Sequence, residues 1–201
     1  MGSPKGDWDL QQGDSPVMAV AIHDGHQLRP AAAAEMKLSE ADRLREEDPY
    51  TGILARPAPT HIVPHCSRFE VDLNRTEEAP VYMGPAQAWG LDVWHQPPSA
   101  QLLAGSNAYY YSFYATYLKQ LERLLTRHES ILVLDLHSYN HRRGGPGATP
   151  DDPEANPDIN LGSGTIDRER FGKVADLFVR EMSQVTISGA SLDVRENVKF
   201  K

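Results

Sequence analysis

Two apolar segments of this sequence each lead into a histidine. The segment VMAVAIHDGH (17–26) places His23 after a run of apolar residues, and ILVLDLHS (131–138) places His137 in a similar setting. Two neutral imidazoles and one carboxylate are the usual protein ligands of a catalytic zinc ion, which keeps a fourth position open for water. A single histidine is more often a surface or core residue. The shared setting of these two therefore indicates a metal site if the fold brings their segments together.

The carboxylate of such a site has to come from a third segment. Glu46, Glu47 and Asp48 end a predicted helix directly before Pro49. The helix dipole disfavours carboxylates at a helix C-terminus, so their position there suggests a cationic partner. Taken alone, the three acids are more typical of a solvated helix end.

A second polar cluster is SRFEVDLNR (67–75), with Arg68 near one end and Arg75 at the other. Two guanidinium groups could bind a substrate carboxylate through paired hydrogen bonds, which lysine cannot reproduce. Alternatively, the two arginines form salt bridges with Glu70 or Asp72. Asp72 and Asn74 could likewise hold neighbouring loops.

Asp135 lies two residues before His137. A metal-ligating histidine usually donates its second ring N–H to a carboxylate or a carbonyl, so Asp135 is a candidate partner for that nitrogen. It could instead bind a backbone amide.

The periodicity of the apolar residues predicts the elements that position these side chains. Strands are predicted at 17–22, 60–65, 68–73, 131–135, 158–162 and 191–197, and helices at 40–47, 109–128 and 167–182. Strands that alternate with helices indicate an α/β sandwich with a mostly parallel or mixed sheet. Ligands of such sheets bind beyond the carboxyl ends of the strands, so His23 and His137 are expected in one crevice.

The remaining segments are predicted to lack regular structure. Residues 76–107 and 142–157 are rich in Pro and Gly and are expected to form long loops that shape the substrate site. Residues 1–15 are expected to be a flexible lead-in, followed by one domain over residues 16–201.

Composition excludes several classes of partner. The formal net charge is −8 with no long block of Lys or Arg, which argues against binding nucleic acid or anionic lipid. The single cysteine, Cys66, excludes an internal disulfide framework and favours a reducing compartment. The apolar stretch at 17–22 is too short to span a bilayer and lacks the basic residues that precede a signal sequence core. We expect a cytoplasmic protein without a membrane segment.

Five segments together resemble a known family. IHDGH, EEDPYT, SRFEVDLNR, DLHSYNHRR and PDINLG, in this order, are similar to the signature segments of the N-formylglutamate amidohydrolase family. The resemblance runs from about residue 18 to the last residue. It implies a three-layer α/β/α sandwich with a mixed, mostly parallel sheet, like that of the zinc carboxypeptidases. It also implies a role in amino-acid catabolism, with hydrolysis of an N-acylated acidic amino acid such as N-formylglutamate to formate and glutamate.

The resemblance also assigns metal ligands. It implies that Zn²⁺ is bound by His23, Asp48 and His137. Glu46 or Glu47 could take the place of Asp48, and His26 is a rival to His23.

The same resemblance assigns the substrate-binding residues. It implies that Arg68, Asn74 and Arg75 bind the substrate carboxylate or polarise the scissile carbonyl. Arg68 is the candidate catalytic residue, because a guanidinium can stabilise the oxyanion of the tetrahedral intermediate. The expected partner is a small N-acyl amino acid, and the sequence does not predict an oligomeric state.

The sequence departs from the family at its end. Family members continue past the segment that matches VKFK, through a Gly-Gly turn, to a strand whose glutamate resembles the carboxypeptidase general base, whereas this sequence ends at Lys201. We therefore expect a truncated chain that lacks this base, with uncertain activity. The alternatives are a catalytically silent fragment that binds an acidic amino acid or a metal, and a zinc carboxypeptidase.

Overall fold

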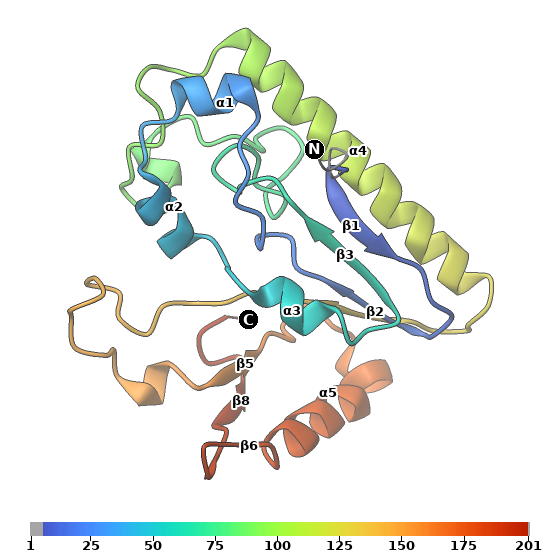
Figure 1. Cartoon of the computed structure of the whole chain (residues 1–201). Helices are drawn as coiled ribbons and strands as arrows, with labels where there is room; N and C mark the ends of the chain where they lie inside the picture. The colour runs from blue at the N-terminus through green and yellow to red at the C-terminus, as the bar shows by residue number, and fades with distance from the viewer. Residues whose placement is uncertain (1–5, 201) are drawn as a thin grey trace. The chain divides into compact units, whose positions relative to one another are not determined.

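The computed structural model describes residues 6–200 of the protein (Figure 1). The chain divides into two compact units, of which the first ends at Tyr139 and the second begins at Asn140. All of the predicted ligands and substrate-binding residues belong to the first unit. The single domain predicted over residues 16–201 stays a prediction.

The first unit is built on a mixed sheet of four strands in the order β1-β3-β2-β4. The strands are β1 (Trp8–Gln11), β2 (Val17–Val20), β3 (Thr60–Pro64) and β4 (Leu132–Asp135). Strand β2 is parallel to both β3 and β4, whereas β1 pairs antiparallel with β3. The prediction of an α/β fold with a mixed sheet is confirmed.

Alternate side chains of β2 and the residues that follow it enter two different cores, as the period of a strand requires. Met18, Val20 and Ile22 pack with the aromatic residues of helix α4 (Ala100–Leu125), which runs alongside the sheet (Figure 1). Ala19 and Ala21 pack in a second, smaller core that includes Ala55 of helix α3 (Thr51–Ala55). Alanine side chains on this face let α3 pack closely against the strand.

Helix α4 begins nine residues earlier than the predicted 109–128, so the loop predicted over residues 76–107 is too long. Ser99 is its N-cap, with Oγ accepting a hydrogen bond from the backbone N–H of Leu102. Its second turn contains Gly105 and Ser106, which are weak helix formers. They weaken the helix signal of the sequence over the first turns of α4. Tertiary contacts compensate, since Arg29 donates to the carbonyl of Gly105 and the Ser106 hydroxyl donates to the carbonyl of Glu70.

The strand predicted at 68–73 is absent, and the segment forms turns. The backbone N–H groups of Glu70 and Val71 both donate to the carbonyl of Ser67, which replaces the hydrogen bonds of a strand ladder. The apolar residues at alternate positions are buried as predicted, but Glu70 and Asp72 are buried as well. A segment that is buried on all sides has no polar face in solvent. The alternation of apolar and polar residues over 68–73 therefore wrongly indicated a strand.

Several further elements of the first unit differ from the predictions. Residues 8–11 were expected to be irregular but form β1, and helices α1 (Pro30–Glu35) and α3 were not predicted. Strand β4 lies at the edge of the sheet and is partly exposed. Helix α2 (Glu40–Glu46) confirms the predicted helix, with Ser39 as its N-cap. A 3₁₀ turn, η1 (Pro85–Gln87), lies within the predicted loop.

The second unit contains a parallel strand pair, a helix and a hairpin. Strands β5 (Ile159–Leu161) and β8 (Val194–Glu196) pair in parallel, and helix α5 (Arg168–Met182) lies between them in the chain. These elements confirm the predicted strands and helix. A 3₁₀ turn, η2 (Pro153–Ala155), and a short hairpin of β6 (Thr186–Ile187) and β7 (Ala190–Ser191) were not predicted. Within residues 6–200, no helix combines the length and apolar character needed to cross a membrane.

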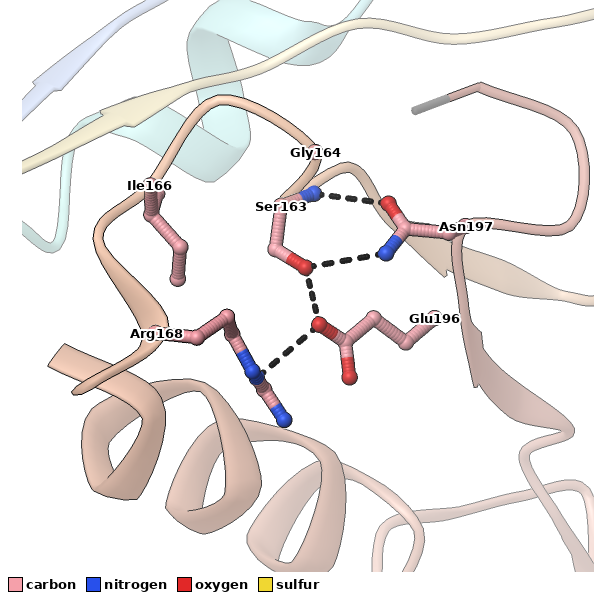
Figure 2. Close-up of a pocket in the computed structure, with 6 residues that line it drawn as sticks. All are labelled: Ser163, Gly164, Ile166, Arg168, Glu196 and Asn197. Atoms are coloured by element: carbon pink, nitrogen blue, oxygen red, sulfur yellow. Dashed lines mark hydrogen bonds and ion pairs between the residues drawn. The ribbon is translucent and has the colours of Figure 1, made fainter.

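A polar cavity of about 330 Å³ lies in the second unit (Figure 2). Its polar side chains satisfy one another. The hydroxyl of Ser163 donates to Glu196, Arg168 Nη1 lies 3.0 Å from Glu196 Oε1, and Asn197 Nδ2 donates to Ser163 Oγ at 3.1 Å. These bonds tie the loop after β5 to the end of β8, so we assign the cluster a structural role.

Candidate metal centre

The structure brings His23, Asp48 and His137 together. One potential ligand atom of each lies within 4.8 Å of the others. Asp48 Oδ2 lies 2.8 Å from His137 Nδ1 and 3.3 Å from His23 Nδ1. His23 and Asp48 are buried, whereas the His137 side chain is 32% exposed, which leaves the cluster open on one side. This arrangement fits a three-ligand metal site with an accessible position.

The topology of the sheet explains this convergence. His23 and His137 follow β2 and β4, which are adjacent parallel strands whose carboxyl ends meet at one edge of the sheet. Asp48 lies between α2 and α3, and its backbone N–H donates to the carbonyl of His23 at 3.1 Å. This bond holds the acidic residue beside the end of β2.

Both histidines have a carboxylate at their second ring nitrogen. His23 Nε2 lies 2.7 Å from Asp72 Oδ1, and His137 Nε2 lies 3.3 Å from Asp135 Oδ2. The structure thus places Asp135 where the sequence suggested. Each carboxylate accepts a hydrogen bond at Nε2, so Nδ1 of both rings is left to face Asp48 or a cation.

The charged groups of this site shift one another's pKa values. Burial acts to raise the pKa of Asp48, but the hydrogen bonds from His137 and His23 outweigh it and lower that pKa to about 2. Burial likewise acts to lower the pKa of His137, but hydrogen bonds to Asp135 and Asp48 raise it to about 9. Asp48 and Asp135 therefore stabilise the protonated form of His137. A metal cation that binds His137 here replaces that proton.

The alternative ligands have other partners. Glu47 is buried, and its carboxylate contacts His26 Nδ1 and accepts a hydrogen bond from the hydroxyl of Ser67. The carboxylate of Glu46 lies 3.4 Å from Arg45. Asp48 is therefore the acid that the structure brings to the histidine pair, and His26 belongs to the Glu47 cluster.

Asp72 connects Arg68 with His23 of the candidate metal site. Arg68 Nη2 lies 3.0 Å from Asp72 Oδ2 and 3.3 Å from the Tyr82 hydroxyl, which itself donates to Asp72. Burial acts to lower the pKa of Arg68, but the charge of Asp72 outweighs it and raises that pKa. The salt bridge considered from the sequence is present, and it points Arg68 toward the carboxylate that holds His23.

Comparison with known proteins identifies the family. The family model described as N-formylglutamate amidohydrolase matches residues 15–201. The chain belongs to the N-formylglutamate amidohydrolase family. No curated protein matches the chain.

Two solved structures share the fold of this N-formylglutamate amidohydrolase family member. An N-formylglutamate amidohydrolase from Ralstonia eutropha JMP134 is 18% identical with a TM-score of 0.73, over 98% of this chain and 78% of that chain. A gene product of Agrobacterium tumefaciens is also 18% identical, with a TM-score of 0.65, over 96% of this chain and 73% of that chain. At this identity the similarity supports the fold alone.

The other two residues that the N-formylglutamate amidohydrolase resemblance assigned to the substrate have structural contacts. The backbone N–H of Asn74 donates to Asp72 Oδ1 at 2.9 Å, and the Asn74 side chain is exposed. Arg75 Nε donates to the carbonyl of Ala79 at 2.7 Å, and its guanidinium lies over the ring of Tyr82 at 5.1 Å. These bonds hold the loop in place, and substrate binding by the two residues stays a prediction.

Asp72 and Tyr82 are the residues of the site whose roles the sequence did not reveal. Asp72 was considered only as a salt-bridge or loop partner, because alternation placed it on a polar face. It is buried and has contacts with His23, Arg68 and Tyr82. Burial acts to raise the pKa of Asp72, but the hydrogen bond and charge of His23 hold it well below its usual range. Tyr82 lies in a segment without apolar periodicity, and no sequence motif marks it as a residue of the site.

Proposed function

We propose that this member of the N-formylglutamate amidohydrolase family is a zinc-dependent hydrolase. Its proposed substrate is an N-acylated acidic amino acid such as N-formylglutamate, cleaved to formate and glutamate. The observation that carries the proposal is the convergence of His23, Asp48 and His137 in a chain of this family. The name of the Ralstonia eutropha neighbour adds support. The three-layer, carboxypeptidase-like arrangement and the cytoplasmic location stay predictions.

The residues present suit zinc. Two imidazole nitrogens and one carboxylate oxygen match the donor set of catalytic zinc, whereas magnesium prefers a shell of oxygens. The Asp72 and Asp135 carboxylates orient the two rings, as partners of zinc-ligating histidines usually do. When bound, the ion supplies Lewis-acid activation of water and polarisation of the scissile carbonyl.

The side chains around the metal centre supply the other requirements of amide hydrolysis. Arg68 carries a permanent positive charge and provides N–H donors for the oxyanion that develops on the scissile carbonyl. Asn74 and Arg75 are proposed to bind the substrate carboxylate. A general base must also transfer the proton of the attacking water to the leaving amine.

Formate release from N-formylglutamate tests the proposed reaction. We expect turnover by the zinc-loaded protein that EDTA abolishes and zinc restores. Arg68→Ala should lower kcat by about 10²- to 10³-fold, as loss of an oxyanion donor does in other hydrolases. The matched control is Arg56→Ala, which removes an exposed arginine at the end of α3 and should leave kcat unchanged.

Two other outcomes would replace the proposed reaction. Calorimetry that detects binding of N-formylglutamate without formate release would identify a silent binding protein. Faster cleavage of dipeptides than of acyl amino acids would identify a carboxypeptidase.

A further inference from the structure

Trp89 is an exposed residue that contacts Arg68. Its side chain is among the exposed large hydrophobic residues, at 55% exposure. Its ring centroid lies 5.9 Å from that of Tyr82 and 6.5 Å from that of Phe69, both of which are buried. The indole therefore has one side on the aromatic core and another side in solvent.

The loop holds Trp89 in an unusual backbone conformation. Trp89 has a φ of 53°, in the left-handed region that bulky residues rarely adopt, and Gly90 follows with a φ of 91°. The turn is closed by hydrogen bonds from Gly90 N to Pro85 O at 2.8 Å and from Leu91 N to Ala88 O at 2.8 Å. Such conformations persist where the surrounding structure requires them, often at functional sites. The loop thus gives the indole a defined place.

The indole of Trp89 lies against the guanidinium of Arg68. The Cζ atom of Arg68 lies over the Trp89 ring, 4.9 Å from its centroid. The hydrogen bonds to Asp72 and Tyr82 both come from Nη2, at one corner of the guanidinium. Among residues 6–200, no hydrogen-bond partner is present for the buried Nε of Arg68. Hydrogen bonds at one corner leave the guanidinium plane free to turn, so an aromatic ring in contact with the guanidinium restricts that rotation.

We propose that Trp89 is a positioning residue, which holds the Arg68 guanidinium in the plane from which it stabilises the oxyanion. This inference rests on the proposed function, because it acts through the role of Arg68 in hydrolysis. Restricting a donor in advance lowers the cost of orienting it in the transition state. Loss of the indole should therefore lower kcat more than it changes KM.

Kinetics of the zinc-loaded full chain with N-formylglutamate test the inference. We expect Trp89→Leu, which keeps apolar bulk without a ring, to lower kcat about tenfold and to change KM less than twofold. Trp89→Phe keeps an aromatic ring and should retain kcat within about threefold. Met83→Ala is the matched control, because Met83 is exposed on the same loop and should leave both constants unchanged. An unchanged kcat in Trp89→Leu, or a change confined to KM, would overturn the inference.

A double-mutant comparison separates positioning from a general structural effect. In the Arg68→Ala background, Trp89→Leu should cause no further loss of kcat, because its effect passes through Arg68. A full tenfold further loss would show that Trp89 acts independently of Arg68. Thermal melting of each variant reports separately on folding.

Fluorescence of the protein without substrate keeps the test independent of turnover. Arg68→Ala should change the tryptophan emission of the wild-type chain but not that of the Trp89→Phe chain. If N-formylglutamate is not hydrolysed, the proposed function fails, and this measurement still decides the contact between Trp89 and Arg68. An emission that does not respond to Arg68→Ala would contradict the contact itself.

Discussion

At the residue scale, Asp72 connects the proposed metal ligands with the residues proposed to act on the substrate. Its Oδ1 faces His23 Nε2, and its Oδ2 faces both Arg68 and Tyr82. One carboxylate therefore sets the orientation of a metal ligand and of the proposed oxyanion donor. Replacing Asp72 by a neutral residue removes the negative charge at His23 Nε2 and should therefore weaken metal binding.

Asp72→Asn is expected to weaken zinc binding about 10- to 100-fold, as is typical for loss of a carboxylate behind a metal-ligating histidine. An amide keeps the shape but accepts the Nε2 hydrogen bond without a negative charge. Competition with a chelating indicator measures the affinity. Asp92→Asn is the control, because Asp92 is exposed and pairs with Lys37 on the surface. Equal affinities of the two variants would refute this role.

The convergence of the two histidines and the place of Asp135 could be predicted from the sequence, but the contacts of Asp72 and Tyr82 could not. His23 and His137 follow apolar strands, and that pattern together with the rule for parallel sheets places them at one edge. The choice among Glu46, Glu47 and Asp48 needed the structure, because neighbouring residues at a helix end point in different directions. Glu47 turns toward His26 and Ser67 instead.

At the scale of elements, the end of α2 depends on the buried carboxylate of Glu47. It receives hydrogen bonds from Ser67 and Arg43 and contacts His26. These partners come from α2 and from the segments that follow β2 and β3. Glu47 thereby fixes the chain directly before Asp48.

Glu47→Ala should lower the free energy of unfolding by about 3–5 kcal/mol, because it leaves the buried Arg43 without its acidic partner. Urea denaturation measures this loss. Glu40→Ala provides the comparison, since Glu40 is exposed and lies near the same histidine. A loss below about 1 kcal/mol in Glu47→Ala, within the range of exposed ion pairs, would show that the cluster is not structurally important.

The N-cap of α4 makes a second prediction at this scale. Ser99→Ala removes the acceptor for the Leu102 N–H and should lower the free energy of unfolding by about 1 kcal/mol. Ser112→Ala, on an exposed part of the same helix, should change it by no more than about 0.5 kcal/mol. The difference between the two denaturation curves checks the cap, and equal stabilities would contradict it.

The elements that were predicted correctly are those with a strong local signal. The apolar runs of β2, β3 and β4 and the Ser39 cap of α2 are of this kind. The segment 68–73 was predicted wrongly because its acids are buried by long-range partners, which local alternation does not reveal. The start of α4 was missed because Arg29 and Glu70 stabilise its weak second turn from distant parts of the sequence.

At the scale of the whole molecule, all three proposed metal ligands belong to the unit that ends at Tyr139. The ligands come from segments separated by 25 and 89 residues. A cation that binds them therefore binds the folded state and not the unfolded chain. The mixed sheet and the family could be predicted from the sequence. The division into two units was not, because the Pro- and Gly-rich segment that follows the boundary was interpreted as a loop.

Zinc should stabilise the folded protein by about 2.7 kcal/mol when its free concentration is 100 times the Kd. Thermal melting with zinc, and again after EDTA, measures the difference. Magnesium at the same concentration is the control and should have a much smaller effect, because the donor set contains two imidazoles. A melting temperature that does not respond to zinc would contradict the linkage.

The most direct measurement of the central claim is the zinc content of the purified chain and of two histidine variants. We predict one zinc ion per wild-type chain, one in His95→Ala, whose histidine is exposed and outside the cluster, and none in His137→Ala. A wild-type chain that binds no zinc, or a His137→Ala chain that retains it, would contradict the account.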